Sequence, residues 1–103
     1  MRRYFAVFAT DKPQMREVRE RVRPSHRAYL RSAPSQGVFV RLGGPTLAPL
    51  GDAMNGTLLV VEADGIGEVM AFIGNDPYMQ AGLFERVEVR PWDWSLGNPE
   101  QRV

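Results

Sequence analysis

The sequence predicts an α+β domain of order βαββαβ, in which one antiparallel sheet carries both helices on a single face. Two observations predict this class. Short runs of apolar and β-branched residues, typical of strands, recur along the chain. Between the first and second runs, and again between the third and fourth, apolar residues recur every three or four positions, as in amphipathic helices.

The first half of the chain supplies a strand, a helix and a second strand. Residues 3–10 are apolar on both alternating faces, which predicts a strand. Asp11 is a candidate N-cap for a helix, and Pro24 is expected to kink or restart that helix. Residues 34–37 end the helical segment, and residues 38–43 predict the second strand. The helical stripe contains Met15, Val18, Val22, His26, Tyr29, Leu30 and Ala33.

The second half begins with residues 43–56, which are rich in Gly, Pro and Ala and are expected to form a functional or mobile loop. Residues 57–62 are nearly all apolar and predict a third strand. Asp76 is a candidate cap for a short helical turn after the second helix. Residues 84–91 alternate charged and apolar side chains, which suits an edge strand. The order is that of a ferredoxin-like fold. The second helical stripe contains Ile66, Val69, Met70 and Ile73.

Length and composition limit the possible classes. With 103 residues the chain forms one domain, here residues 1–94, followed by a polar C-terminal tail, residues 95–103, expected to be poorly ordered. No run approaches the ~18 apolar residues of a membrane span, and the first residues lack the features of a signal peptide. The absence of cysteine excludes disulfides and thiolate metal sites. We expect a soluble, cytoplasmic protein with no membrane partner.

Charge is balanced overall, with 13 basic and 12 acidic residues, but arginines concentrate between residues 16 and 31. Such a stripe can indicate a nucleic-acid site. A solvated helix face with pairs such as Glu17–Arg21 is the favoured interpretation, because the pI is only about 8.2 and no nucleic-acid motif is present. A third interpretation is that one arginine holds an anionic group of a substrate. The stripe contains Arg16, Arg19, Arg21, Arg23, Arg27 and Arg31.

The predicted sheet is apolar on both faces, although helices can cover only one. The first strand places Tyr4, Ala6 and Phe8 on one side and Phe5, Val7 and Ala9 on the other. Exposed apolar surface costs about 25 cal/mol per Å². We therefore expect a homodimer that packs the two open sheet faces together into a barrel.

His26 is the only histidine, and imidazole transfers protons near neutral pH. Its place on the apolar stripe predicts that it points toward the sheet. A structural, partly buried histidine is the alternative, and for Asp76 the alternative is ordinary helix capping. Neither residue identifies an enzyme by itself.

An ordered set of motifs resembles the YciI-like (YCII-related) family over almost the whole chain. The set comprises Arg23-Pro24-x-His26-x-x-Tyr29-Leu30, Gly37, Gly44-Pro45, Gly56, Asp76-Pro77-Tyr78 and Gly82. The resemblance implies a dimeric α+β barrel in which His26 and Asp76 face a common cavity as a candidate catalytic pair. A family relative in chlorinated-aromatic breakdown is a dehydrochlorinase, and muconolactone isomerase shares the broader fold.

These residues support a hypothesis of acid–base catalysis. A carboxylate beside the imidazole orients it, and the histidine can then take and return a proton, as an isomerisation or HX elimination requires. We expect no metal or cofactor, and substrate contacts from Arg23, Tyr29, Gly44, Pro45 and Tyr78. The alternatives are a cofactor-independent oxygenase and a non-catalytic domain that binds a small ligand or a partner protein.

Overall fold

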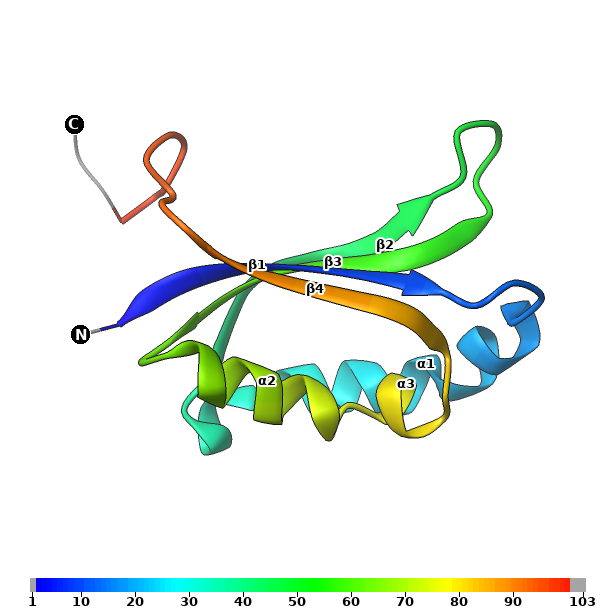
Figure 1. The fold of residues 1–103 in the computed structure, drawn as a ribbon, viewed down its shortest axis with the longest axis horizontal. Helices are drawn as coiled ribbons and strands as arrows, with labels where there is room; N and C mark the ends of the chain where they lie inside the picture. The colour runs from blue at the N-terminus through cyan, green and yellow to red at the C-terminus, as the bar shows by residue number, and fades with distance from the viewer. Residues whose placement is uncertain (1, 101–103) are drawn as a thin grey trace.

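A computed structural model describes residues 2–100 and shows one four-stranded sheet with helices on one side (Figure 1). The strands are antiparallel and follow the order β2-β3-β1-β4, with β4 at an edge as predicted. The ferredoxin-like order βαββαβ is confirmed. The elements are β1 (Arg3–Asp11), α1 (Arg16–Arg31), the short 3₁₀ helix η1 (Ala33–Gln36), β2 (Phe39–Leu47), β3 (Met54–Ala63), α2 (Ile66–Gly74), α3 (Pro77–Gln80) and β4 (Phe84–Trp92).

The core lies between the sheet and the helices. Alternate residues of the two central strands point into it, so that Phe5 pairs with Val61 and Val7 with Leu59 across β1 and β3. All four are at most 3% exposed, and Phe72 of α2 packs against this cluster. Burial of these side chains fixes which face of each central strand turns toward the helices, because a slip of one residue would expose them.

The loop predicted for residues 43–56 is wrong in extent. Strand β2 continues through this segment to Leu47, and only residues 48–53 join it to β3. Gly43 pairs with Leu59, and a Cβ at Gly43 would come within 2.7 Å of the Leu59 Cδ2. Pro45 lacks an N–H donor but is tolerated because β2 is an edge strand. Gly43 therefore allows a close contact between β2 and β3, and the segment around it pairs as a strand rather than forming a loop.

The start of the first helix also differs from the prediction. Helix α1 begins at Arg16 after Met15, and Asp11 is the last residue of β1 rather than a helix cap. The Asp11 carboxylate instead binds Arg19. The helix does not restart at Pro24, which lies inside the continuous element α1.

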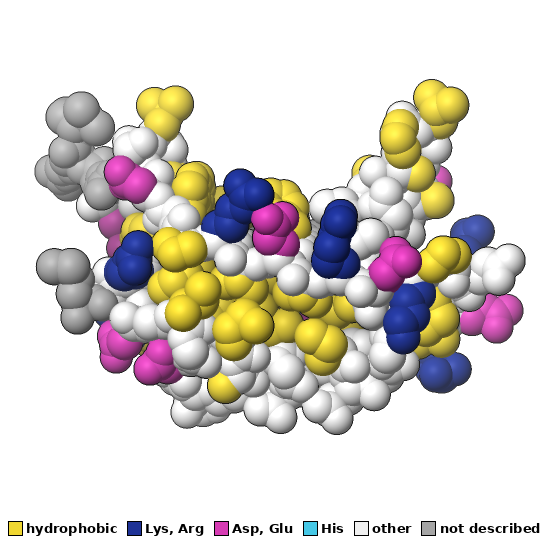
Figure 2. All heavy atoms as spheres, in the orientation of Figure 1, with side chains coloured by type: hydrophobic (Ala, Val, Ile, Leu, Met, Phe, Trp, Pro, Cys, Tyr) yellow, Lys and Arg dark blue, Asp and Glu magenta, His cyan; other side chains and the backbone are white. Residues whose placement is uncertain are grey.

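The other sheet face carries no helix and is hollowed between two projections (Figures 1 and 2). Phe8, Leu42 and Leu58 are 46%, 52% and 37% exposed on it. The C-terminal segment folds back near this face, since Trp94 and Asn98 are buried and both contact Tyr4. The described part of the predicted polar tail, residues 95–100, is thus anchored to the sheet, and residues 101–103 lie outside the described residues. Among residues 2–100, no helix has the length and apolar character needed to cross a membrane.

Candidate functional site

His26 and Asp76 lie in direct contact although 50 residues separate them. The Nδ1 atom of His26 is 2.8 Å from Oδ1 and 2.9 Å from Oδ2 of Asp76. Both residues are buried, at 6% and 3% exposure. Because an ionised carboxylate can only accept hydrogen bonds, Nδ1 carries a hydrogen and donates a hydrogen bond to Asp76. Nε2 is then the ring atom that is free to accept or deliver a proton.

The chain between α2 and α3 holds the carboxylate in place. Asp76 is the N-cap of α3, and its Oδ1 also accepts a hydrogen bond from the backbone N–H of Tyr78 at 2.9 Å. Pro77 occupies the first turn of α3, where a missing N–H costs nothing. The predicted cap therefore exists, and its carboxylate contacts the imidazole as well.

The ring of Tyr78 packs flat against the imidazole. The two ring centroids are 3.9 Å apart with an interplanar angle of 17°. Tyr78 is 1% exposed, so this stack is held within the protein interior. The carboxylate on Nδ1 and the tyrosine on the ring face together leave the imidazole a single orientation.

The remaining edge of His26 borders a cavity of about 180 Å³. No described group forms a hydrogen bond with Nε2. Every fully buried polar side-chain atom of the described residues has a hydrogen-bond partner, so Nε2, which has none, is not fully buried and stays accessible from the cavity. The cavity lies between α1, α3 and the β2–β3 hairpin. It is lined by Arg19, Arg23, His26, Arg27, Leu30, Gly43, Gly44, Pro45, Met54, Thr57 and Tyr78.

A buried arginine forms one end of this cavity. Arg19 is 4% exposed and donates to both carboxylate oxygens of Asp11, at 2.7 and 2.9 Å, and to the Thr57 hydroxyl at 2.8 Å. It also lies over the Tyr78 ring, 4.7 Å from the centroid. Burial alone lowers the pKa of the Arg19 guanidinium, but the hydrogen bond and charge of Asp11, with a smaller effect of Tyr78, raise the pKa above its ordinary value.

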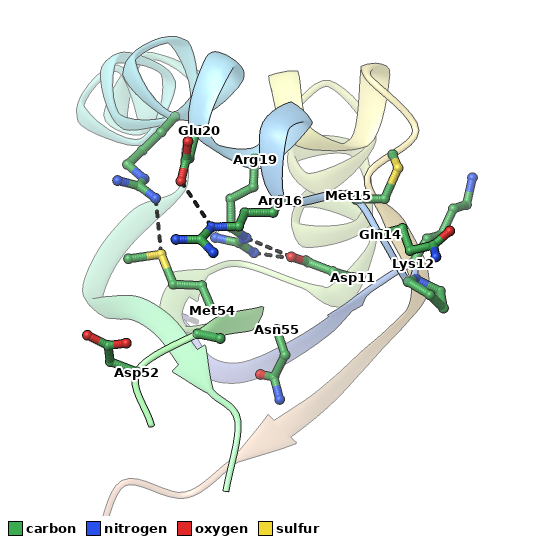
Figure 3. A pocket seen from close by; sticks show the side chains of 13 residues that line it. Asp11, Lys12, Gln14, Met15, Arg16, Arg19, Glu20, Asp52, Met54 and Asn55 are labelled. Atoms are coloured by element: carbon green, nitrogen blue, oxygen red, sulfur yellow. Dashed lines mark hydrogen bonds and ion pairs between the residues drawn. The ribbon is translucent and has the colours of Figure 1, made fainter. Parts of the chain in front are cut away.

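A wider cavity of about 540 Å³ adjoins the first one and shares three of its lining residues, Arg19, Arg23 and Met54. Figure 3 shows it between the N-terminal half of α1 and the chain around Met54 and Asn55. The Arg23 guanidinium contacts the Met54 sulfur at 3.1 Å, the contact marked by the dashed line that ends at Met54 in Figure 3. Arg23 and Met54 thus mark the boundary between the two cavities.

Four of the five predicted substrate contacts, Arg23, Gly44, Pro45 and Tyr78, line the cavity beside His26. Tyr29 does not. Its hydroxyl donates to the Phe72 carbonyl at 2.6 Å and its ring stacks on Phe72, so it ties α1 to α2. Burial and the nearby charge of Asp76 raise the pKa of Tyr29, although its hydrogen bond to Gln36 acts in the opposite direction.

Sequence reasoning missed the cluster of Arg19, Asp11 and Thr57. A signal was present, because positions 19, 23, 26 and 30 follow the three- and four-residue spacing of one helix face. A stripe defined by apolar residues leaves out Arg19, because Arg19 is charged. Among residues 2–100, no group of three His, Cys, Asp or Glu side chains is arranged to hold a metal ion.

Comparisons with known proteins agree with this fold. The model of the YCII-related domain matches residues 3–93. Protein YciI of Escherichia coli is 28% identical over 92 residues, which cover 85% of this chain and 94% of that protein. An uncharacterized protein of Haemophilus influenzae is 26% identical over 93 residues, covering 86% of this chain and 95% of that protein.

Among solved structures, the chain resembles 5-chloro-2-hydroxyhydroquinone dehydrochlorinase (TftG) from Burkholderia phenoliruptrix, in complex with 2,5-dihydroxybenzoquinone. The identity is 35%, the TM-score is 0.77, and the match covers 87% of this chain and 93% of that one. A dimeric ferredoxin-like protein of unknown function from Bacteroides fragilis, 16% identical with a TM-score of 0.56, shares the fold over 90% of this chain and 96% of its own. By the match over residues 3–93, the chain belongs to the YCII-related family.

Proposed function

We propose that this protein is a lyase or isomerase that transfers a proton on a small, ring-derived or enolisable substrate, with His26 as the base. The observation that carries the proposal is the bond from Nδ1 of His26 to Asp76, which leaves Nε2 at the cavity surface. Asp76 orients the imidazole and stabilises the imidazolium that forms when Nε2 takes a proton.

The reaction can be written with its protons and electrons in balance. Nε2 of His26 removes a proton from a carbon next to a carbonyl, which a ring hydroxyl supplies in its keto tautomer. The C–H electron pair forms a carbon–carbon double bond while the carbonyl π electrons move onto oxygen, which gives an enolate. In an elimination, the carbonyl re-forms, the double bond shifts to the next carbon, and a halide on that carbon departs with the electrons of its bond. In an isomerisation, the imidazolium returns the proton to a different atom. Both need a single group that acts as base and then as acid, which is the ordinary role of histidine.

The dehydrochlorinase relative supports elimination as the first reaction to test. That protein is named for its action on 5-chloro-2-hydroxyhydroquinone, and it is 35% identical to this chain. The cavity of about 180 Å³ beside His26 is smaller than the ~300–1,000 Å³ typical of ligand pockets, which favours a substrate with a single ring.

The proposal is tested by incubating the protein with 5-chloro-2-hydroxyhydroquinone under anaerobic conditions and measuring chloride release. We expect His26→Gln to lower kcat by about 10²–10⁴-fold, the usual contribution of a positioned acid–base group. Asp76→Asn should also lower kcat, because an amide donor facing Nδ1 favours the tautomer that carries its proton on Nε2. The exposed neighbour Ser25 provides the control, and Ser25→Ala should leave kcat unchanged.

Two results would contradict the proposal. Turnover that survives His26→Gln at the wild-type rate would exclude His26 as the base. Ligand binding by the wild-type protein without turnover of any enolisable ring compound would favour the alternative, a non-catalytic domain that binds a small molecule.

We also propose that the molecule acts as a homodimer through its open sheet face. The exposed apolar side chains Phe8, Leu42 and Leu58 on this face support a partner that buries them. A cytoplasmic location is part of the same proposal, since a chain without cysteine is compatible with a reducing compartment.

A further inference from the structure

The cavity beside His26 is lined by three arginines, Arg19, Arg23 and Arg27. No aspartate or glutamate of residues 2–100 lines it. This charge is local, because the whole chain has a formal net charge of only +1. A small concave site whose walls carry one sign of charge concentrates ions of the opposite sign.

Two of these positive charges have no carboxylate partner among residues 2–100. Arg19 is neutralised by Asp11, and His26 donates to Asp76. Within the described part of the chain, the hydrogen bond of Arg23 goes to the thioether of Met54, which is a weak acceptor, and Arg27 forms no ion pair there. Most of the five N–H donors of the Arg23 guanidinium therefore remain available to a ligand.

The spacing of the arginines is itself unfavourable. Arg19, Arg23 and Arg27 follow one another at four-residue intervals on α1, so like charges lie one above the other on the same helix face. Glu20 forms its ion pair with Arg16 and not with any of these three arginines. An anion bound among these side chains would relieve the repulsion and supply the missing partner.

Arg23 is also well placed relative to the reacting group. It precedes His26 by three residues, which puts the two side chains about one helical turn apart on the same face. Arg23 is partly buried at the boundary of the two cavities, whereas Arg27 is exposed at the rim.

We propose that Arg23 binds an ionised oxygen acid of the substrate, a carboxylate or an ionised enol, while His26 acts on the adjacent carbon framework. The substrate is then a small unsaturated anion. Arg27 adds to the attraction at the rim and Arg19 remains a structural cation paired with Asp11. This inference rests on the proposed function only for the identity of His26 as the reacting group.

The test is an equilibrium titration with two matched pairs of probes, benzoate with benzamide and sorbate with sorbamide. Within each pair the two compounds have nearly the same shape and differ in charge. Because the chain has a single histidine, the two carbon-bound protons of its ring give one assignable pair of NMR signals that reports occupancy of the cavity. We expect at least one of the anions to bind, and its neutral amide to bind at least 10-fold more weakly.

Variants locate the anion contact. Arg23→Gln should raise the Kd of the anion about 10-fold or more and leave that of the amide unchanged, and Arg23→Lys should restore part of the affinity. Arg21→Gln removes the same charge from an exposed position of α1 that lines neither cavity, and should leave Kd unchanged. Equal affinity for anion and amide, no binding of either anion, or equal effects of Arg23→Gln and Arg21→Gln would overturn the inference.

These measurements distinguish a failure of the anion subsite from a failure of the proposed function. Loss of anion binding in Arg23→Gln supports the subsite even if no compound is turned over. Turnover that depends on His26 but shows an unchanged KM for an anionic substrate in Arg23→Gln would overturn the subsite and leave the proposed function standing.

Discussion

At the scale of single residues, the buried guanidinium of Arg19 shows how charge is accommodated in this small domain. Its charge is met by both oxygens of Asp11, and its remaining donors by Thr57 and Tyr78. Removing one partner of such a pair leaves an uncompensated charge away from water, which costs far more than the intact pair contributes. Arg19 is therefore expected to be sensitive to the loss of Asp11.

We predict that Asp11→Asn destabilises the fold by about 3 kcal/mol, the scale observed when a buried pair loses one member. Glu20→Gln is the control, because Glu20 forms an exposed pair with Arg16 that is worth under about 1 kcal/mol. Urea unfolding of both variants measures the difference. Similar losses in the two variants would show that the Asp11–Arg19 pair is not a buried interaction in solution.

Tyr29 provides a prediction about pH. Its pKa is raised in the folded protein by burial and by Asp76, so the unfolded chain releases the phenolic proton first as pH rises. The contribution of Tyr29 to stability is therefore complete below the unfolded pKa of about 10 and declines above it. We expect the difference in unfolding free energy between the wild type and Tyr29→Phe to be smaller at pH 10.5 than at pH 8. An equal difference at both pH values would contradict the raised pKa.

At the scale of elements, the hairpin of β2 and β3 depends on close contacts at glycine. A Cβ at Gly56 would lie 2.7 Å from the Thr46 hydroxyl oxygen and would also clash with the Ala9 carbonyl oxygen of β1. A Cβ at Gly44 would meet nothing within 4 Å. The two glycines lie in paired strands but have opposite steric requirements.

We predict that Gly56→Ala destabilises the protein by about 2 kcal/mol, because it forces an extra carbon against the backbone of β1. Gly44→Ala, the matched change in the neighbouring strand, should alter stability by less than about 0.5 kcal/mol. Thermal unfolding of both variants tests this. Equal tolerance of the two substitutions would mean that residues 43–56 pair less closely than the structure shows.

The same hairpin shows which parts of the fold the sequence could predict and which it could not. Periodicity predicted the order of strands and helices along the chain and placed His26 on the inward face of α1, and cap chemistry predicted the turn at Asp76, because both signals are local. The composition of residues 43–56 indicated a loop, since a glycine that permits close strand pairing looks the same as one that permits a turn. Asp11 resembles a helix cap in the sequence for a similar reason: an aspartate before a proline looks the same whether it caps a helix or pairs with a buried arginine. Its partner Arg19 is near in sequence, but the bonds to Thr57 and Tyr78 that bury Arg19 span 38 and 59 residues.

At the scale of the whole molecule, the sheet has helices on one face only. Val60 of β3 is 6% exposed on the open face, whereas its neighbours Leu42, Leu58 and Phe8 remain accessible. The hollow between the two projections in Figure 2 lies over this face. Leu50 and Leu96, in the two segments that rise beside it, are about nine-tenths exposed, at 91% and 89%. The apolar strip over β1, β2 and β3 lies beside Arg86, Glu88 and Arg90 of β4, which share this face. A strip of apolar side chains bordered by charges of both signs suits a second copy of the same surface.

We predict that the protein, with a chain mass of 11.6 kDa, sediments as a dimer at micromolar concentration. Leu58→Lys should dissociate it, because the substitution places a charge in the centre of the proposed interface, where burial without a partner is costly. Met70→Lys is the matched control: Met70 is 53% exposed on α2, on the side of the molecule that carries the helices, and the variant should remain dimeric. Unfolding measurements on both variants separate dissociation from loss of the fold. A monomeric wild type, or a Leu58→Lys variant that stays folded and dimeric, would exclude the open sheet face as the interface.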